Sequence, residues 1–344
     1  MIDINNYFQE AIKKGASDIH LVGGELPVLR VHGDLVGLSD APLDNKELSE
    51  AIYKIISKER RDLYDSEKEL DFAYEIDGIR FRVNLHQQVE KIGLAARLIP
   101  AVIPSPDDLR FNETMVNLTE LYDGLVLVTG PTGCGKSTTL ACMIEEINKK
   151  RKAHIITIED PIEFIFKDNQ SLIEQREVGK DTKSFANALK HVLRQDPNVI
   201  LVGEMRDPET IAIVLTAAET GHLVFSTLHT SSAAEAIERI VDVFEGAKQK
   251  QVLLQLSSVL RAVVAQTLLP AKDGGRVPAR EILINNSAVA NLIRENNVNQ
   301  IKSAIQTGAK EGMMTMENSV KELFDEGLID KDLASRRIGR SKKV

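Results

Sequence analysis

The sequence predicts an α/β protein with two parts, a small α+β N-terminal domain and a larger α/β domain that ends in a helical region. Three observations carry this prediction. A stretch rich in proline and aspartate, residues 99–108, interrupts the 344-residue chain and makes regular structure there improbable. After it, short apolar runs alternate with helical stretches, as in a mostly parallel sheet. The first of these runs leads directly into the glycine-rich segment GPTGCGKST at residues 130–138.

The N-terminal domain is expected to cover residues 1–99, and residues 100–113 are expected to form the linker. Apolar and polar residues alternate in three stretches of this domain, which is typical of half-buried strands. Helix-like pieces lie between them, which indicates a small α+β module. The expected strands are residues 26–36, 70–74 and 79–85.

The second domain is expected to cover residues 114–344. One helix is well marked, because Phe185, Leu189 and Val192 recur on one face and Asp196 with Pro197 ends the pattern. The expected strands of the sheet are residues 125–128, 154–158, 199–202 and 222–228. Beyond residue 245 the pattern predicts mainly helices, at residues 252–268, 287–295, 298–305 and 315–326.

Composition narrows the classes of function. The chain has 43 Lys and Arg against 51 Asp and Glu, a net charge of −8, which disfavours nucleic acid as the main partner. We see no secretory signal and no run of 18 apolar residues, so a cytoplasmic protein without direct membrane insertion is expected. The two cysteines, Cys134 and Cys142, are too close in sequence to indicate a disulfide framework.

The segment at residues 130–138 fits the phosphate-binding pattern G-x-x-x-x-G-K-[S/T] after a buried strand. Its glycines permit the backbone to turn amides toward phosphate, and the helix that follows directs its positive end there. Lys136 would bind the β- and γ-phosphates, and the Ser137 hydroxyl would bind Mg²⁺. ATP and Mg²⁺ are therefore the expected ligands. The expected nucleotide-binding residues of this loop are Gly130, Thr132, Gly133, Cys134, Gly135, Lys136, Ser137 and Thr138.

Carboxylates follow two more of the predicted strands. Glu204 comes directly after the apolar run VILV and is the expected catalytic base, which would polarise the attacking water. Gly203 stands where an Mg²⁺-binding Asp is common. Glu159, Asp160 and Glu163 follow the preceding strand as further nucleotide-binding candidates, with a capped, solvated turn as the alternative.

Two histidines bracket the run GHLVFSTLH. His222 and His229 would lie on opposite faces of a regular strand, so they need not contact the same ligand. His229 is the candidate for sensing the γ-phosphate, and a structural, hydrogen-bonded histidine is the alternative. For Cys134, the neighbouring Lys136 and the helix N-terminus favour a reactive thiolate, whereas a side chain packed away from the phosphates is the alternative.

In this order, GPTGCGKST, TIEDPIEF, VILVGEMRDPET and TAAETGHLVFSTLHT resemble the Walker A, Asp, Walker B and His boxes of the type II/IV secretion ATPase superfamily. The segments ASDIHL, RFRVN, QREV, LIRE, AIQTG and GMMTM narrow the resemblance to the type IV pilus retraction ATPases, the motors of twitching motility. The resemblance covers nearly the whole chain.

This resemblance implies a PAS-like N-terminal domain, a RecA-like P-loop ATPase domain, and a homohexamer that hydrolyses ATP to power pilus retraction. It further implies work at the inner-membrane base of a pilus machine, on an inner-membrane platform protein, with a paralogous motor ATPase as another candidate partner. Arg80, Arg82 and Arg97 match the family's arginine segments, and Arg82 and Arg97 are the expected catalytic arginines supplied to a neighbouring subunit.

The chain also departs from the family's pattern. Glu90 and Lys91 replace the usual Arg-Gly, and Ala290 stands where an arginine is common. Two alternatives therefore remain. One is a pilus-extension or type II secretion ATPase, and the other is a nucleotide-binding regulatory ring without motor activity of its own.

Overall fold

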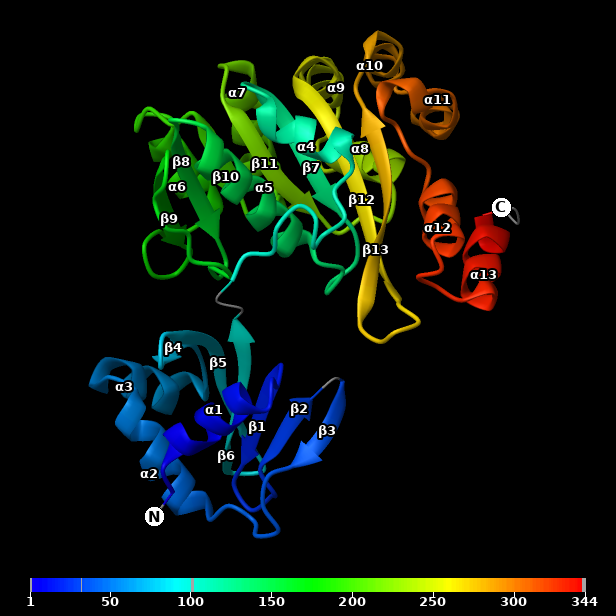
Figure 1. Cartoon of the computed structure of the whole chain (residues 1–344). Coiled ribbons are helices and arrows are strands. Elements are labelled where there is room, and N and C mark those ends of the chain that lie inside the picture. The colour runs from blue at the N-terminus through cyan, green and yellow to red at the C-terminus, as the bar shows by residue number, and fades with distance from the viewer. Residues whose placement is uncertain (1, 32, 100–101, 342–344) are drawn as a thin grey trace. The chain divides into compact units, whose positions relative to one another are not determined.

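The computed structural model describes residues 2–31, 33–99 and 102–341 (Figure 1). The chain divides into two compact units, residues 1–102 and 103–344, each with its own hydrophobic core. Residues 100 and 101 of the predicted linker lie outside the described part. The domain limits at residues 99 and 113 remain a prediction.

The first unit is an antiparallel six-stranded sheet packed against three helices. Its strand order is β3-β2-β1-β6-β5-β4. The rings of Phe8 and Phe81 meet edge to face at 4.8 Å in the core, and neither is exposed. The strands are β1 (Asp18–Val22), β2 (Val28–Val31), β3 (Asp34–Gly37), β4 (Glu69–Ile76), β5 (Ile79–Gln88) and β6 (Lys91–Ile99), and the helices are α1 (Ile4–Lys13), α2 (Asn45–Ile55) and α3 (Lys58–Glu67).

Two of the three strands predicted in this unit are present and longer than expected, as β4 and β5. The third prediction, residues 26–36, is wrong as one strand, because the stretch forms β2 and β3 of a hairpin. Gly33 lies between them with a φ of 98°, a left-handed angle that favours glycine. Residue 32, within this stretch, lies outside the described residues. The α+β character of the unit follows the prediction.

The second unit is built on a seven-stranded sheet of order β13-β12-β7-β11-β10-β8-β9. Its neighbouring strands are parallel, except that β13 is antiparallel to β12. The strands are β7 (Gly124–Thr129), β8 (His154–Glu159), β9 (Leu172–Glu177), β10 (Val199–Val202), β11 (Leu223–Leu228), β12 (Leu260–Pro270) and β13 (Arg276–Ile284). The helices are α4 (Glu113–Asn117), α5 (Lys136–Lys150), α6 (Phe185–Val192), α7 (Pro208–Glu219), α8 (Ala233–Asp242), α9 (Ala247–Val259), α10 (Ser287–Arg294), α11 (Ile301–Thr307), α12 (Met316–Asp325) and α13 (Lys331–Ser341), with 3₁₀ turns η1 (Leu118–Glu120), η2 (Val298–Gln300) and η3 (Ala309–Glu311).

Alternate residues of each strand pack on opposite faces of this sheet. On β7, Val126 and Val128 join the core beneath α4 and α5, whereas Leu125 and Leu127 join the core beneath α6 to α11. The α12 and α13 helices cover the far end of the β12–β13 hairpin (Figure 1). Because the parallel strands β7, β8, β10 and β11 end at the same edge, the segments after them meet there.

The predicted helix at residues 252–268 is wrong in its second half. The α9 helix ends at Val259, and β12 begins at Leu260 without an intervening turn. The β12 strand pairs with β7 on one side and β13 on the other, so the C-terminal region begins with a hairpin that extends the sheet. The fold class is otherwise confirmed. Among the described residues, no helix is long and apolar enough to span a bilayer.

Candidate nucleotide-binding and hydrolysis site

The loop between β7 and α5 has the backbone of an anion-binding turn. Gly130, Gly133 and Gly135 have φ angles of 144°, 78° and 88°, which favour glycine. Gly135 is the N-cap of α5, and no side chain caps this helix, whereas Ser184 caps α6 and Asp207 caps α7. The first-turn amides of α5 are therefore left for a ligand, and the helix dipole favours an anion there.

Lys136 lies buried at the start of α5, with only 9% of its surface exposed. Its Nζ donates to the carbonyl oxygens of Gly130 at 2.8 Å and Pro131 at 3.3 Å. Burial lowers the pKa of the ammonium, and neighbouring anionic groups, the carboxylates of Glu204 and Glu163 among them, partly offset this. A buried cation held by neutral carbonyls fits a loop whose anion is supplied by the ligand.

Glu204 and His229 are brought together by two adjacent parallel strands. Glu204 follows β10, and His229 follows β11. One oxygen of Glu204 lies 2.7 Å from the Arg206 guanidinium and the other lies 3.3 Å from His229 Nε2. Arg206 is 73% exposed along its side chain, so its hold on the carboxylate is screened by solvent. The Glu204 carboxylate therefore lies between Arg206 and His229 at the edge where β10 and β11 end.

The three carboxylates after β8 have different surroundings. Glu159 accepts a hydrogen bond from Thr157 at 2.6 Å and a longer one from Gln175 at 3.4 Å, and burial raises the pKa of its carboxyl group. Asp160 and Glu163 are exposed. Exposure of Asp160 and Glu163 agrees with a solvated turn and also leaves both carboxylates accessible to a ligand, whereas Glu159 is held by hydrogen bonds within the protein.

The residues present fit a magnesium ion that is shared with phosphate. Among the described residues, no three His, Cys, Asp or Glu side chains gather as a metal site of their own. A side chain at Gly203 would be tightly packed, since a Cβ there would lie 3.3 Å from the Ile158 oxygen and 3.4 Å from Glu159 Cα. Ser137, in the first turn of α5, would hold the ion together with phosphate and water. Bound Mg²⁺ would offset charge on the β- and γ-phosphates.

His222 is far from this edge, at the start of β11. Its Nδ1 lies 2.9 Å from the Ala217 oxygen and 3.1 Å from Thr220 Oγ1, at the end of α7. His222 is therefore a structural, hydrogen-bonded histidine, which is the alternative that the sequence analysis gave. Only His229 of this pair joins the site.

The Cys134 thiol points into packed protein. Only 3% of its surface is exposed, and burial raises its pKa despite the proximity of Lys136. Cys142 is also buried, and burial raises its pKa to about 12. The expectation of a reactive Cys134 thiolate is therefore wrong, because the sequence shows the nearby charge but not the desolvation.

We expect both thiols to react slowly with N-ethylmaleimide at pH 7.5 in the folded protein, and MgADP to change neither rate. Burial disfavours the thiolate and limits access of the reagent. Peptide mass mapping after timed labelling measures each rate, and unfolding in urea should expose both thiols to fast reaction. Rapid labelling of Cys134 that MgADP suppresses would restore the rejected interpretation.

The predicted arginines of the first unit lie side by side on its sheet. Arg82 on β5 is directly opposite Arg97 on β6, and Arg97 is opposite Asp18 on β1. Arg97 Nε donates to Asp18 at 2.8 Å. Burial raises the pKa of Asp18, but hydrogen bonds from Arg97 and Ser17 outweigh this and lower it. Arg82 is exposed, and Asp18 offsets the charge of the Arg97 side chain that lies opposite it.

The departures at Glu90 and Lys91 lie where β5 turns into β6. Val89 and Glu90 have φ angles of 46° and 60°, between the paired residues Gln88 and Lys91. Such a two-residue turn favours Asn-Gly, so this chain has a strained, exposed tip.

Reasoning from the sequence missed several residues that support the site. Arg206 stands in the VGEMRDPET box, and its spacing of two from Glu204 was an available signal. Thr157 and Gln175 hold Glu159, and neither has a pattern of its own. Gln266 contacts the loop from β12, which the sequence predicted to be helical.

Comparison with known proteins is decisive for the family. The model of the family "Type II/IV secretion system protein" matches residues 1–327. The chain belongs to this family. It is 46% identical over 337 residues to the type IV pilus retractation ATPase PilT of Pseudomonas aeruginosa, covering 98% of each chain. It is 48% identical over 320 residues to a twitching motility protein of Neisseria gonorrhoeae, covering 92% of this chain and 86% of that protein.

A solved structure agrees with this assignment. The crystal structure of the pilus retraction motor PilT with bound ADP matches with a TM-score of 0.91 and 45% identity, over 98% of this chain and 97% of that one. The resemblance to type IV pilus retraction ATPases is thereby confirmed.

Proposed function

We propose that this protein is an ATP hydrolase whose turnover powers retraction of a type IV pilus and twitching motility. One observation carries the proposal: the Glu204–His229 pair lies at the same sheet edge as an anion-binding loop that contains a buried Lys136. Glu204 and Glu163 both act electrostatically on Lys136, so phosphate and water would meet between these groups. The similarity to PilT over 98% of both chains supports retraction as the work done.

In the proposed reaction, the amides of the loop and Lys136 bind the β- and γ-phosphates. Glu204 orients the attacking water and accepts its proton as the oxygen attacks γ-phosphorus and the bond to the β-phosphate oxygen breaks. His229, 3.3 Å from Glu204, would report the presence of the γ-phosphate to the segment after β11. Glu159 would support the magnesium ion held by Ser137.

We further propose that the active form is a homohexamer. Arg82 and Arg97 would each serve the nucleotide of a neighbouring subunit, which is why an isolated subunit would be slow. Force would act on an inner-membrane platform protein from the cytoplasmic side, and a paralogous motor ATPase is a second candidate partner. Ser137, Glu159, Asp160, Glu163 and His229 remain proposed ligand-binding residues.

The test in vitro is release of phosphate from MgATP by the purified chain, with Lys136→Ala as the inactive control. We expect steady turnover that depends on Mg²⁺ and is lost in the control. A chain that binds ATP but releases no phosphate at any protein concentration would instead be the regulatory ring.

The test in vivo is the number of surface pili after deletion of the gene in its host. Loss of a retraction motor should leave excess pili and no twitching, and the wild-type gene should reverse both effects. A strain without surface pili would identify an extension motor instead.

A further inference from the structure

A buried arginine links the phosphate loop to the start of the second unit. Arg280 lies on β13, with 5% of its surface exposed. Its Nε donates to Gln266 Oε1 at 2.8 Å, and its two terminal nitrogens donate to the carbonyl oxygens of Leu109 at 2.8 Å and Arg110 at 3.0 Å. Its guanidinium also lies 5.3 Å from the centre of the Phe111 ring. Within the described part of the chain, no carboxylate pairs with it.

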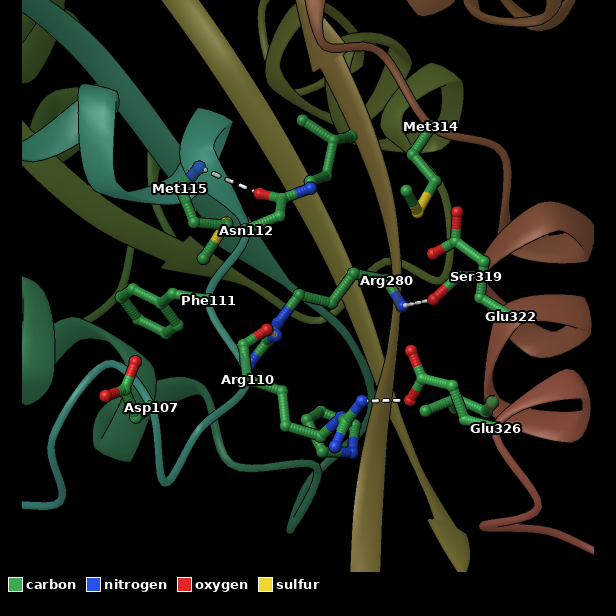
Figure 2. Close-up of a pocket in the computed structure, with 13 residues that line it drawn as sticks. Asp107, Arg110, Phe111, Asn112, Met115, Arg280, Met314, Ser319, Glu322 and Glu326 are labelled. Carbon is green, nitrogen blue, oxygen red and sulfur yellow. Dashed lines mark hydrogen bonds and ion pairs between the residues drawn. The ribbon is translucent and has the colours of Figure 1, made fainter.

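The two backbone acceptors of Arg280 belong to one segment, residues 105–112, which we call the strap. The strap lies just after the point, between residues 102 and 103, where the chain passes from the first unit to the second. Its second anchor is an ion pair between the Arg110 side chain and Glu326, the residue directly after α12 (Figure 2). Both anchors border a cavity of about 370 Å³ between the strap, β13 and α12. A buried guanidinium needs hydrogen-bond acceptors. Arg280 therefore stabilises the conformation in which the strap lies against β13, which we call the docked strap.

Arg280 is connected to the phosphate loop through Gln266, which accepts a hydrogen bond from Arg280 and donates one to the loop. This residue is 3% exposed and directly opposite Arg280 in the β12–β13 register. Its Oε1 accepts from Arg280 and from Thr139 Oγ1, and its Nε2 donates to the Cys134 carbonyl oxygen at 2.6 Å. A guanidinium can only donate, so Arg280 fixes the Gln266 amide with its NH₂ group toward the loop.

The bond to the Cys134 oxygen has a consequence for phosphate binding. In a planar trans peptide, the carbonyl of Cys134 and the amide N–H of Gly135 point in opposite directions. By holding this carbonyl, Gln266 directs the Gly135 amide away from β12. Gly135 is the uncapped N-cap of α5, where a phosphate oxygen would accept this hydrogen bond.

We propose that Gln266 and Arg280 are positioning residues that couple nucleotide binding in the phosphate loop to docking of the strap. The coupling is reciprocal: bound nucleotide stabilises the docked strap, and a docked strap strengthens nucleotide binding by the same factor. This inference rests on nucleotide binding, one part of the proposed function, and adds a route from the loop to the segment that joins the two units.

The experiment is hydrogen–deuterium exchange of peptides that cover the strap, in the full-length protein with and without MgADP, together with the Kd for MgADP. In the wild type, MgADP should slow exchange in the strap. In Arg280→Met, which keeps the length and removes the donors, the strap should exchange fast with or without MgADP, and MgADP should bind roughly tenfold more weakly.

Gln266→Glu separates the contact between residue 266 and Arg280 from the contact between residue 266 and the Cys134 oxygen. Its carboxylate still pairs with Arg280 but cannot donate to Cys134, so the strap should exchange slowly without nucleotide while MgADP binds weakly. Arg276→Met, at an exposed position of the same strand, is the matched control and should behave as the wild type. Arg280→Lys should recover part of the protection, and this variant also serves if Arg280→Met does not fold.

Two outcomes would overturn the coupling. One is a wild type that binds MgADP without any change in strap exchange, and the other is full MgADP protection of the strap in Arg280→Met together with wild-type MgADP affinity in Gln266→Glu. A wild type that fails to bind MgADP would instead reject nucleotide binding itself, and with it the proposed function.

Discussion

Replacing Glu204 by glutamine should lower the turnover number for ATP by about 100-fold or more while leaving the affinity for ATP close to that of the wild type. The amide keeps the size of the side chain and its place beside His229, but it cannot accept a proton from water. Lys136→Ala should differ by weakening the binding of ATP, because it removes the buried cation that is expected to bind the phosphates. Its Kd for ATP should rise, and turnover should fall with it.

Steady-state phosphate release and binding of a fluorescent ATP analogue separate the two effects. Glu209→Gln is a suitable control, since Glu209 lies on helix α7 and its carboxylate pairs with Lys190 on the surface. The assignment of the base is wrong if Glu204→Gln hydrolyses ATP at the wild-type rate.

Arg82→Gln should lower turnover about 1,000-fold in the assembled protein and change ATP affinity much less, because a guanidinium from a neighbour acts on the transition state. Activity per subunit of the wild type should also rise with protein concentration. Arg97→Gln should lower turnover and also disturb its own unit, since Arg97 donates to Asp18 there. Asp18 would keep its contacts with Ser17 and Arg30.

A mixing experiment tests whether the arginine acts between subunits. Neither Arg82→Gln nor Lys136→Ala should be active alone. Rings that contain both should regain activity, because a site with an intact loop then meets a neighbour with an intact arginine. Mixtures that stay inactive although mass measurements show mixed rings, or full activity in a demonstrated monomer, would contradict the prediction.

Local signals explain which elements of the fold the sequence predicted well. The β10 strand was placed at its observed bounds, Val199–Val202, because Pro197 precedes it and Gly203 follows it. The change from α9 to β12 was missed, because no glycine or proline separates them and the apolar run continues through Leu260. The β6 strand was missed as well, since its Ala-Ala-Arg segment is extended by pairing with β1 and β5 on either side.

The site was predictable where a residue follows a strand, as Lys136, Glu204 and His229 do. It was not predictable where burial or a contact distant in sequence decides the chemistry. Cys134 is an example, since its desolvation depends on packing against other elements. Gln266 is another, because its contact with the loop spans more than a hundred residues of chain.

The glycine at position 203 has a consequence for the spacing of two strands. A Cβ there would lie 3.3 Å from the Ile158 oxygen and 3.4 Å from Glu159 Cα, so β8 would have to move by a few tenths of an ångström to admit a side chain. Glycine therefore lets the ends of β8 and β10 approach closely, and the carboxylate at the end of this strand pair is Glu159 of β8.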